Sequence, residues 1–234
     1  MRFDLLALGV ATLGAVAIAA QPASAAKFQY DPPTIGGNNK AGNHEDINTI
    51  FDTNSELLTW SSTFSRNNKG HLADGAWLVL TEGGNPKYQE QEYAIFYLDG
   101  IEKKLTAYSY NGQNNSSSYK HNTFLGSWDL DVEEGNDERT FSFALDMTDI
   151  NSRTDIDAGW KGALFGEKIG VWFHGVTGLE TDYDSNGQLT EFTYKKSGWH
   201  DVGNKDTEQI PEPALALGLG TAAVIGAVRR KRSA

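Results

Sequence analysis

Short runs of alternating apolar and polar residues fill the middle of the chain. Over residues 139–146 (RTFSFALD), Phe141, Phe143 and Leu145 fall at every second position, so an extended strand carries them on one face. Further β-type runs, each bounded by turn residues, cover residues 47–52, 57–64, 76–81, 93–99, 104–110, 126–132, 168–174 and 189–194. No stretch between residues 46 and 202 has a sustained apolar stripe at helical spacing. The pattern therefore predicts an all-β domain.

The number and spacing of these runs predict the architecture. Many short strands in one domain favour a two-sheet sandwich of jelly-roll or concanavalin-like type. Residues 53–56 (TNSE) join the first two runs as a predicted hairpin. Paired prolines, glycines and asparagines make residues 26–45 a predicted linker. Residues 203–210 are predicted to be a spacer before the last segment. A single domain over residues 46–202 remains between them, long enough to bury one core.

An apolar stretch precedes the predicted linker. Residues 5–20 (LLALGVATLGAVAIAA) follow Met1 and Arg2, and Ala23-Ser24-Ala25 has the small-x-small pattern of a signal-peptide cleavage site. Residues 1–25 are therefore expected to form the helix of a secretory signal peptide. A first transmembrane helix that is not removed is the alternative.

A second apolar stretch, over residues 214–228, lies between a short motif and a basic cluster. The motif is Pro211, Glu212 and Pro213, and the cluster is Arg229, Arg230, Lys231 and Arg232. An apolar helix followed by cations enters a membrane with its charged end in the cytoplasm. The order of these features resembles the PEP-CTERM sorting signal of exported bacterial proteins.

The resemblance implies that residues 211–234 hold a short transmembrane helix and are recognised by exosortase, a membrane enzyme that cuts near the tripeptide. The mature protein is then released or re-anchored. A plain C-terminal tail anchor without processing is the alternative. Either way, the body of the chain is expected outside the inner membrane.

Composition is in keeping with an exported domain. The chain has no cysteine, so it forms no disulfide and offers no thiol for catalysis. Its formal net charge is −11 although five cations lie in the two terminal segments, so the domain between them is more acidic still. Nucleic-acid binding needs a basic footprint, and it is therefore not expected. An acidic domain suits binding of divalent cations or residence in a polysaccharide matrix.

Three segments of the body are also similar to a known group. They are residues 74–80 (DGAWLVL), 106–112 (TAYSYNG) and 162–173 (GALFGEKIGVWF). Similar segments occur in uncharacterised cyanobacterial proteins that carry the same sorting tail. The resemblance spans most of residues 46–202 and implies a β-sandwich ectodomain, but no activity.

One loop has the residue spacing of a calcium site. Asp182, Asp184 and Asn186 place oxygen ligands at alternate positions, and Gly187 stands at the sixth position. An EF-hand has Glu at the twelfth position, where this chain has Thr193, with Glu191 two residues early. The other interpretation is a hairpin turn over Asn186-Gly187, since Asp also favours such turns. No other cofactor is expected.

Carboxylates at alternate positions suggest a hydrolase. Asp129, Asp131 and Glu133 would share one face of a strand, and retaining glycosidases use two carboxyl groups about 5 Å apart. The segment resembles the Glu-x-Asp-x-x-Glu signature of concanavalin-like β-glucanases. In that family the first position is the Glu nucleophile, and the shorter Asp129 would draw back from the reacting carbon. A polar, solvent-facing strand is the alternative, and it is preferred.

Other catalytic patterns are missing from the sequence. It contains no Gly-x-Ser-x-Gly motif and no glycine-rich phosphate loop. The histidines are scattered, and no two are spaced to share a metal on one element: His44, His71, His121, His174 and His200. The chain is therefore expected not to be an enzyme.

Aromatic residues suggest a binding surface. Trp60, Trp77 and Trp172 lie in apolar runs and are expected in the core. The other three tryptophans lie beside glycine and polar residues and could form an exposed platform on which sugar rings stack: Trp128, Trp160 and Trp199.

Together these patterns predict an exported, exosortase-processed protein of the cell surface, extracellular matrix or biofilm, with an adhesive or structural role. Its expected partners are the export machinery, exosortase, and surface glycans or exopolysaccharide. A secreted carbohydrate-binding module, assisted by calcium, is the alternative from a different class. A β-glucanase-like hydrolase is a further alternative.

Overall fold

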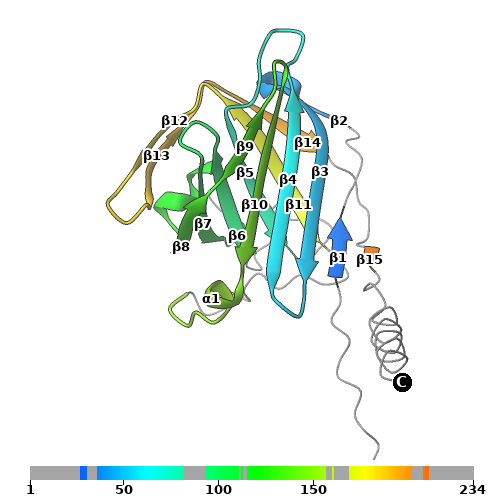
Figure 1. Ribbon diagram of the computed structural model, residues 1–234. Helices are drawn as coiled ribbons and strands as arrows, with labels where there is room; N and C mark the ends of the chain where they lie inside the picture. The colour runs from blue at the N-terminus through cyan, green and yellow to red at the C-terminus, as the bar shows by residue number, and fades with distance from the viewer. Residues whose placement is uncertain are drawn as a thin grey trace, which may run out of the picture.

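Antiparallel strands make up nearly all of the regular structure (Figure 1). The computed structural model describes residues 27–30, 36–81, 93–110, 112, 115–156, 160, 169–201 and 208–210. Two large sheets and one separate hairpin contain the strands, and the described helices are at most six residues long. The prediction of an all-β fold is confirmed.

The first large sheet has six strands in the order β15-β1-β3-β4-β10-β9. Their bounds are β1 (Lys27–Tyr30), β3 (Asn43–Asp52), β4 (Leu57–Ser65), β9 (Asp131–Glu134), β10 (Glu138–Asp146) and β15 (Glu208–Ile210). The predicted hairpin is present, since β3 and β4 pair with Asp52 opposite Leu57. The short helix α1 (Thr148–Asn151) follows β10.

The second large sheet has seven strands in the order β2-β14-β11-β5-β6-β7-β8. Their bounds are β2 (Gly36–Gly37), β5 (Gly75–Thr81), β6 (Tyr93–Asp99), β7 (Lys104–Tyr110), β8 (Phe124–Asp129), β11 (Gly170–Thr177) and β14 (Lys196–Asp201). The remaining pair is β12 (Glu180–Tyr183) with β13 (Leu189–Thr193). Two 3-10 helices, η1 (Asn39–Ala41) and η2 (Asn115–Lys120), complete the elements.

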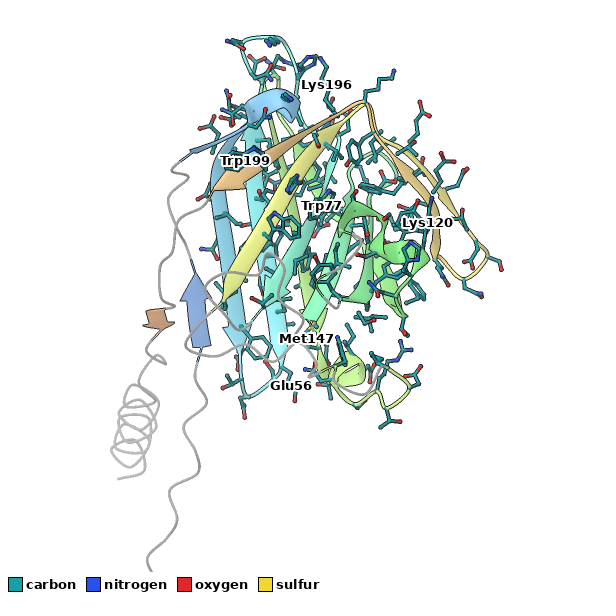
Figure 2. The ribbon with its side chains drawn as sticks, turned by 180° about the vertical axis from the view of Figure 1, so that it is seen from behind. Glu56, Trp77, Lys120, Met147, Lys196 and Trp199 are labelled. Carbon is teal, nitrogen blue, oxygen red and sulfur yellow. The ribbon has the colours of Figure 1, made fainter. Side chains whose placement is uncertain are left out.

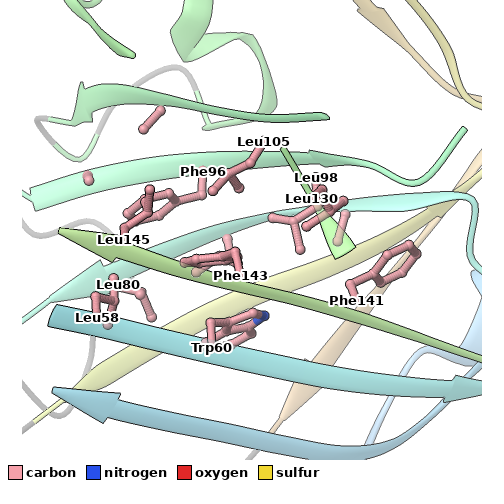
Figure 3. Packing of buried hydrophobic residues seen from close by; sticks show 14 of the residues in the cluster. Leu58, Trp60, Leu80, Phe96, Leu98, Leu105, Leu130, Phe141, Phe143 and Leu145 are labelled. Carbon is pink, nitrogen blue, oxygen red and sulfur yellow. The ribbon is translucent and has the colours of Figure 1, made fainter. Parts of the chain in front are cut away.

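The two large sheets pack face to face across one main core (Figure 3). Ring contacts join the sheets directly: Trp60 of β4 lies 5.7 Å from Phe173 of β11, and Phe143 of β10 lies 5.6 Å from Phe96 of β6, measured between ring centroids. All four side chains are buried. This burial is the main stabilising contribution to a sandwich, because large aromatic rings remove the most apolar area from water.

A second core lies on the outer face of the seven-stranded sheet. The β12–β13 hairpin and η2 fold over this face and cover Tyr97 of β6 with Tyr108 and Tyr110 of β7. Tyr119 of η2 packs edge-on against Tyr97, and so does Phe192 of β13. The sheet interior is therefore apolar on both faces, which is why β5, β6 and β7 lack the strict alternation of β10.

Most predicted strands are found, but one is divided. The sequence indicated a single strand over residues 126–132, whereas β8 ends at Asp129 in one sheet and β9 begins at Asp131 in the other. Leu130 between them is buried in the main core. Apolar residues face the shared core both before and after the chain crosses from one sheet to the other. The alternation of apolar and polar residues therefore continues through Leu130 and does not show that the strand ends there.

The segment predicted as a linker contains regular structure. Residues 26–45 include β1, β2 and η1, and the predicted spacer includes β15. Strand β1 pairs with β3 on one side and with β15 on the other, with Lys27 opposite both Asp52 and Ile210. The two ends of the described chain therefore lie side by side at the end of the sandwich where β3 turns into β4 (Figure 1).

The predicted signal helix and transmembrane helix lie outside the described residues. Within the described part of the chain, no helix has both the length and the apolar character needed to cross a membrane.

Candidate ligand-binding site

A pocket of about 480 Å³ opens at the end of the sandwich opposite the paired strands β1 and β15. Three segments far apart in sequence form it: η1, the loop between β4 and β5, and the start of β14 with the residues before it. They contribute four lysines, which are Lys40, Lys69, Lys195 and Lys196. His71, Tyr194 and Ser197 complete the lining. We call this the lysine pocket; Figure 2 labels Lys196 at its edge.

Asn67 holds two walls of the lysine pocket together. Its buried side chain accepts hydrogen bonds from the backbone N–H groups of Lys69 and His71, each at 2.9 Å. The same side chain donates through Nδ2 to the carbonyl of Asn39 in η1 at 2.6 Å. One amide thus fixes the β4–β5 loop against η1, so the lysines on these two segments are held on a defined backbone.

The third wall depends on a glycine. The backbone N–H of Asn38, just before η1, donates to the carbonyl of Trp199 in β14 at 2.8 Å. Gly198 makes this approach possible, because a Cβ at that position would lie only 2.1 Å from the carbonyl oxygen of Asn38. Across the pocket, the Lys196 ammonium donates to Nε2 of His71 at 2.5 Å and links β14 to the loop.

A row of aromatic residues lies on the outer face of the seven-stranded sheet. Trp199, His174 and Trp77 lie opposite one another on β14, β11 and β5. The Trp77 ring stacks on His174 with centroids 4.1 Å apart, and Trp172 packs edge-on against Trp77 at 5.0 Å. Trp77 is nearly buried, whereas 48% of Trp199 is exposed (Figure 2). Trp199 therefore offers a ring face to a ligand beside a supported aromatic surface.

No protein-family model, curated protein or solved structure matches the chain. The chemistry of these surfaces is therefore inferred from their residues.

The three tryptophans predicted as one platform lie on different surfaces. Trp128 is opposite Leu105, a residue of the main core, and is itself half-buried against that core. Trp160 is also half-buried against the main core. Trp199 alone of the three is among the exposed large apolar side chains of the described residues. Trp60 and Trp77 are buried as expected, and Trp172 packs against the second core.

The predicted calcium loop forms the turn between β12 and β13. Asp184 Oδ1 accepts hydrogen bonds from the backbone N–H groups of Asn186 and Gln188, at 2.8 and 2.9 Å. Gly187 has a φ of +79°, which the turn requires. Asp182 lies on β12 opposite Glu191. Within the described ranges, no group of three or more His, Asp or Glu side chains is arranged to hold a metal.

The carboxylates of the hydrolase hypothesis belong to different sheets. Asp129 ends β8 opposite Lys104, whereas Asp131 begins β9 opposite Ser142. Together with Glu133 they are exposed to solvent. The single strand face that would have aligned the three side chains is not formed, because the chain changes sheet at Leu130.

A buried histidine pair was not predicted. His44 of β3 and His200 of β14 meet in the core with ring centroids 5.1 Å apart, and each is 5% exposed. His44 Nε2 shares a hydrogen bond with the Ser62 hydroxyl at 3.0 Å, but neither ring nitrogen of His200 has a partner among the described residues. Burial lowers the pKa of His44 to about 4 and that of His200 to about 3. The two residues lie far apart in sequence and in different sheets, so their spacing along the chain did not indicate that they are in contact.

The predicted sorting residues lie outside the described part of the chain. These are Pro211, Glu212 and Pro213 with Arg229, Arg230, Lys231 and Arg232.

Proposed function

We propose that this chain is an exported protein of the cell surface or extracellular matrix, sorted by exosortase through residues 211–234, with an adhesive or structural role. Its sandwich is proposed to be of the jelly-roll or concanavalin-like type. The sequence of the two terminal segments and the acidic composition of the body support this function.

The pairing of β1 with β15 is the structural observation that favours the proposal. Lys27 follows the predicted signal-peptide cleavage site, and Ile210 directly precedes Pro211. The two residues are opposite each other at one end of the sandwich. A membrane segment attached there leaves the lysine pocket at the other end, about 30 Å away along the ten residues of β3. Such an arrangement suits display of a binding end away from the membrane.

Processing at the tripeptide can be tested by substitution. Replacing Glu212 and Pro213 together with Ala is expected to leave the unprocessed chain in the inner membrane, because the residues that exosortase is proposed to recognise are gone. The measurement is the intact mass of the protein recovered from envelope and medium. The unsubstituted chain is expected to end near Glu212.

Glu208→Ala provides a control for loss of the carboxylate, since it makes the same Glu-to-Ala change four residues earlier in β15. It is expected to be processed normally. A C-terminus still at Ala234 in the unsubstituted protein would contradict the proposal and leave a plain tail anchor.

Carbohydrate binding is the second candidate, and the exposure of Trp199 favours it. Aromatic rings that are held rigidly at a surface offer a flat apolar face at little entropic cost. Strand β14 holds Trp199 opposite His174, so the ring is attached to a paired strand rather than to a loop.

Trp199→Ala is expected to weaken glycan binding about tenfold or more, because loss of a stacking aromatic anchor removes a central contact. Binding to a glycan array by the two forms is the measurement. Leu57→Ala is the control, because Leu57 is a similarly exposed apolar residue at the β3–β4 end of the sandwich. An array on which the unsubstituted protein binds nothing would exclude this function.

A further inference from the structure

The lysine pocket gathers positive charge in an acidic protein. Lys40, Lys69, Lys195 and Lys196 line one cavity, while the whole chain carries a formal charge of −11. No Asp or Glu belongs to the lining, and none of the ion pairs found among the described residues involves these lysines. Four ammonium groups that repel one another without a carboxylate between them favour an external anion.

One acidic turn beside the β4–β5 loop is already engaged. Asp137, between β9 and β10, is paired with Arg66 at 3.1 Å. Arg66 also donates from Nη1 to the carbonyl of Gly70, at 2.9 Å, and so lies along the outside of the β4–β5 loop. The Asp137 carboxylate thus pairs with Arg66 and does not neutralise the pocket lysines.

The size and the neutral lining of the pocket indicate more than an inorganic ion. A volume of about 480 Å³ is typical of sites for small organic molecules. Ser197 adds a hydroxyl group. Tyr194, whose own hydroxyl donates to Ser116 at 3.4 Å, adds a ring supported by Phe192 at 6.2 Å. A ligand with hydroxyl groups and a negative charge would use both the ammonium groups and the Ser197 hydroxyl.

Trp199 extends this surface along the same strand. It lies two residues after Ser197 of the pocket lining, so these two side chains share one face of β14, about 7 Å apart. A saccharide chain anchored by its charge in the pocket could therefore reach the exposed indole ring with a neighbouring sugar. An isolated anion or a short peptide carboxylate would leave this second contact unused.

We propose that the lysine pocket binds the anionic groups, carboxylate or sulfate, of an acidic polysaccharide, with Trp199 stacking on an adjacent sugar. This inference rests on the proposed function as a surface or matrix protein and names its ligand class. The pocket supplies charge recognition, and Trp199 supplies the apolar contact.

The test uses the exported protein purified from cells that produce the full chain. Binding of oligogalacturonate is compared with binding of its methyl ester, which has the same backbone without the charge; dextran sulfate and dextran form a second matched pair. Isothermal titration at low and high salt is the measurement. We expect binding of at least one charged member and not of its neutral partner, and weaker binding at high salt.

The double substitution Lys69→Gln/Lys196→Gln removes one ammonium group from each of two walls and is expected to weaken binding about tenfold. Lys103→Gln/Lys120→Gln makes the same change of charge at exposed lysines outside the pocket and is expected to bind as the unsubstituted protein does. The comparison of charged and neutral saccharides needs no variant, so the proposal stays testable even if a variant fails to fold.

Several outcomes would overturn the inference. One is equal binding to the charged and neutral members of both pairs, or no binding to either. Another is binding of free sulfate or phosphate with no gain from a saccharide. Self-association that the pocket double substitution abolishes would identify a second copy of the chain as the partner instead. If the same preparation has the mass expected of the processed form, failure to bind acidic saccharides counts against the pocket and not against the proposed sorting.

Discussion

Mild acid is expected to destabilise the native protein strongly through the buried histidine pair. The pKa values of His44 and His200 are lowered to about 4 and about 3, from 6.5 for an ordinary histidine. Both rings therefore stay neutral in the native state between pH 6.5 and about pH 5, while the unfolded chain takes up two protons over this range. The free energy of unfolding falls by about 1.4 kcal/mol per histidine for each pH unit below 6.5, so about 4 kcal/mol is lost at pH 5. That is a large part of the total stability of a typical domain.

Urea unfolding at pH 7.5 and pH 5, followed by tryptophan fluorescence, measures this loss. His200→Leu removes one of the two groups together with two buried nitrogens that have no partner among the described residues. The loss should then be about 2 kcal/mol. His121→Leu, at an exposed position, is the control for the loss of a histidine that is not buried. Equal stability of the unsubstituted protein at the two pH values would show that the pair is not buried in the neutral form.

Asp99→Ala is expected to lower the free energy of unfolding by about 3–5 kcal/mol. The Asp99 side chain is 1% exposed and accepts four hydrogen bonds. Oδ1 accepts from the backbone N–H groups of Ile101 and Glu102, at 2.9 and 3.0 Å. Oδ2 accepts from the hydroxyl groups of Thr181 and Tyr183, at 2.5 and 2.9 Å. Truncation leaves these four partly buried donors without their acceptor.

The loss also reaches the second core, because Thr181 and Tyr183 attach the β12–β13 hairpin to the β6–β7 turn through this carboxylate. Burial, and then the Asp99 charge, raise the pKa of Tyr183, so the tyrosine stays a hydrogen-bond donor. Asp182→Ala is the control: it makes the same chemical change at an exposed position of the hairpin. Urea unfolding at pH 7.5 compares the two variants. A loss of less than about 1 kcal/mol in the free energy of unfolding of Asp99→Ala would show that the Asp99 carboxylate does not hold the hairpin in place.

Local patterns were enough to find most strands. The predicted bounds of β6 and β7 agree with the structure, and those of β5 and β10 differ by one residue. Strands β12 and β14 were missed for identifiable reasons. The first is short and polar, with exposed Glu180 and Asp182, and the second contains Gly198 and two adjacent polar residues at its start. Their pairing partners stabilise them, and a propensity taken from one segment does not include that contribution.

The candidate sites depended on contacts between distant segments. The lysine pocket joins residues 40, 69 and 195, and the histidine pair joins residues 44 and 200. Each of these residues has an ordinary local context in the sequence. Of the predicted platform, Trp199 is exposed because its side chain falls on the outer face of β14, whereas Trp128 falls on the core side of β8. Which face is covered depends on where the β12–β13 hairpin packs.

By itself, the sequence determined the all-β class, most strand positions and the β3–β4 hairpin, because each depends on residue periodicity and turn chemistry over a few neighbours. Only the tertiary structure decided the change of sheet at Leu130, the second core, the pairing of β1 with β15, and the meeting of four lysines at the opposite end. These features depend on which strands pair and on which faces of the sheets pack against each other. That choice is governed by burial summed over the whole domain, which no short window of sequence contains.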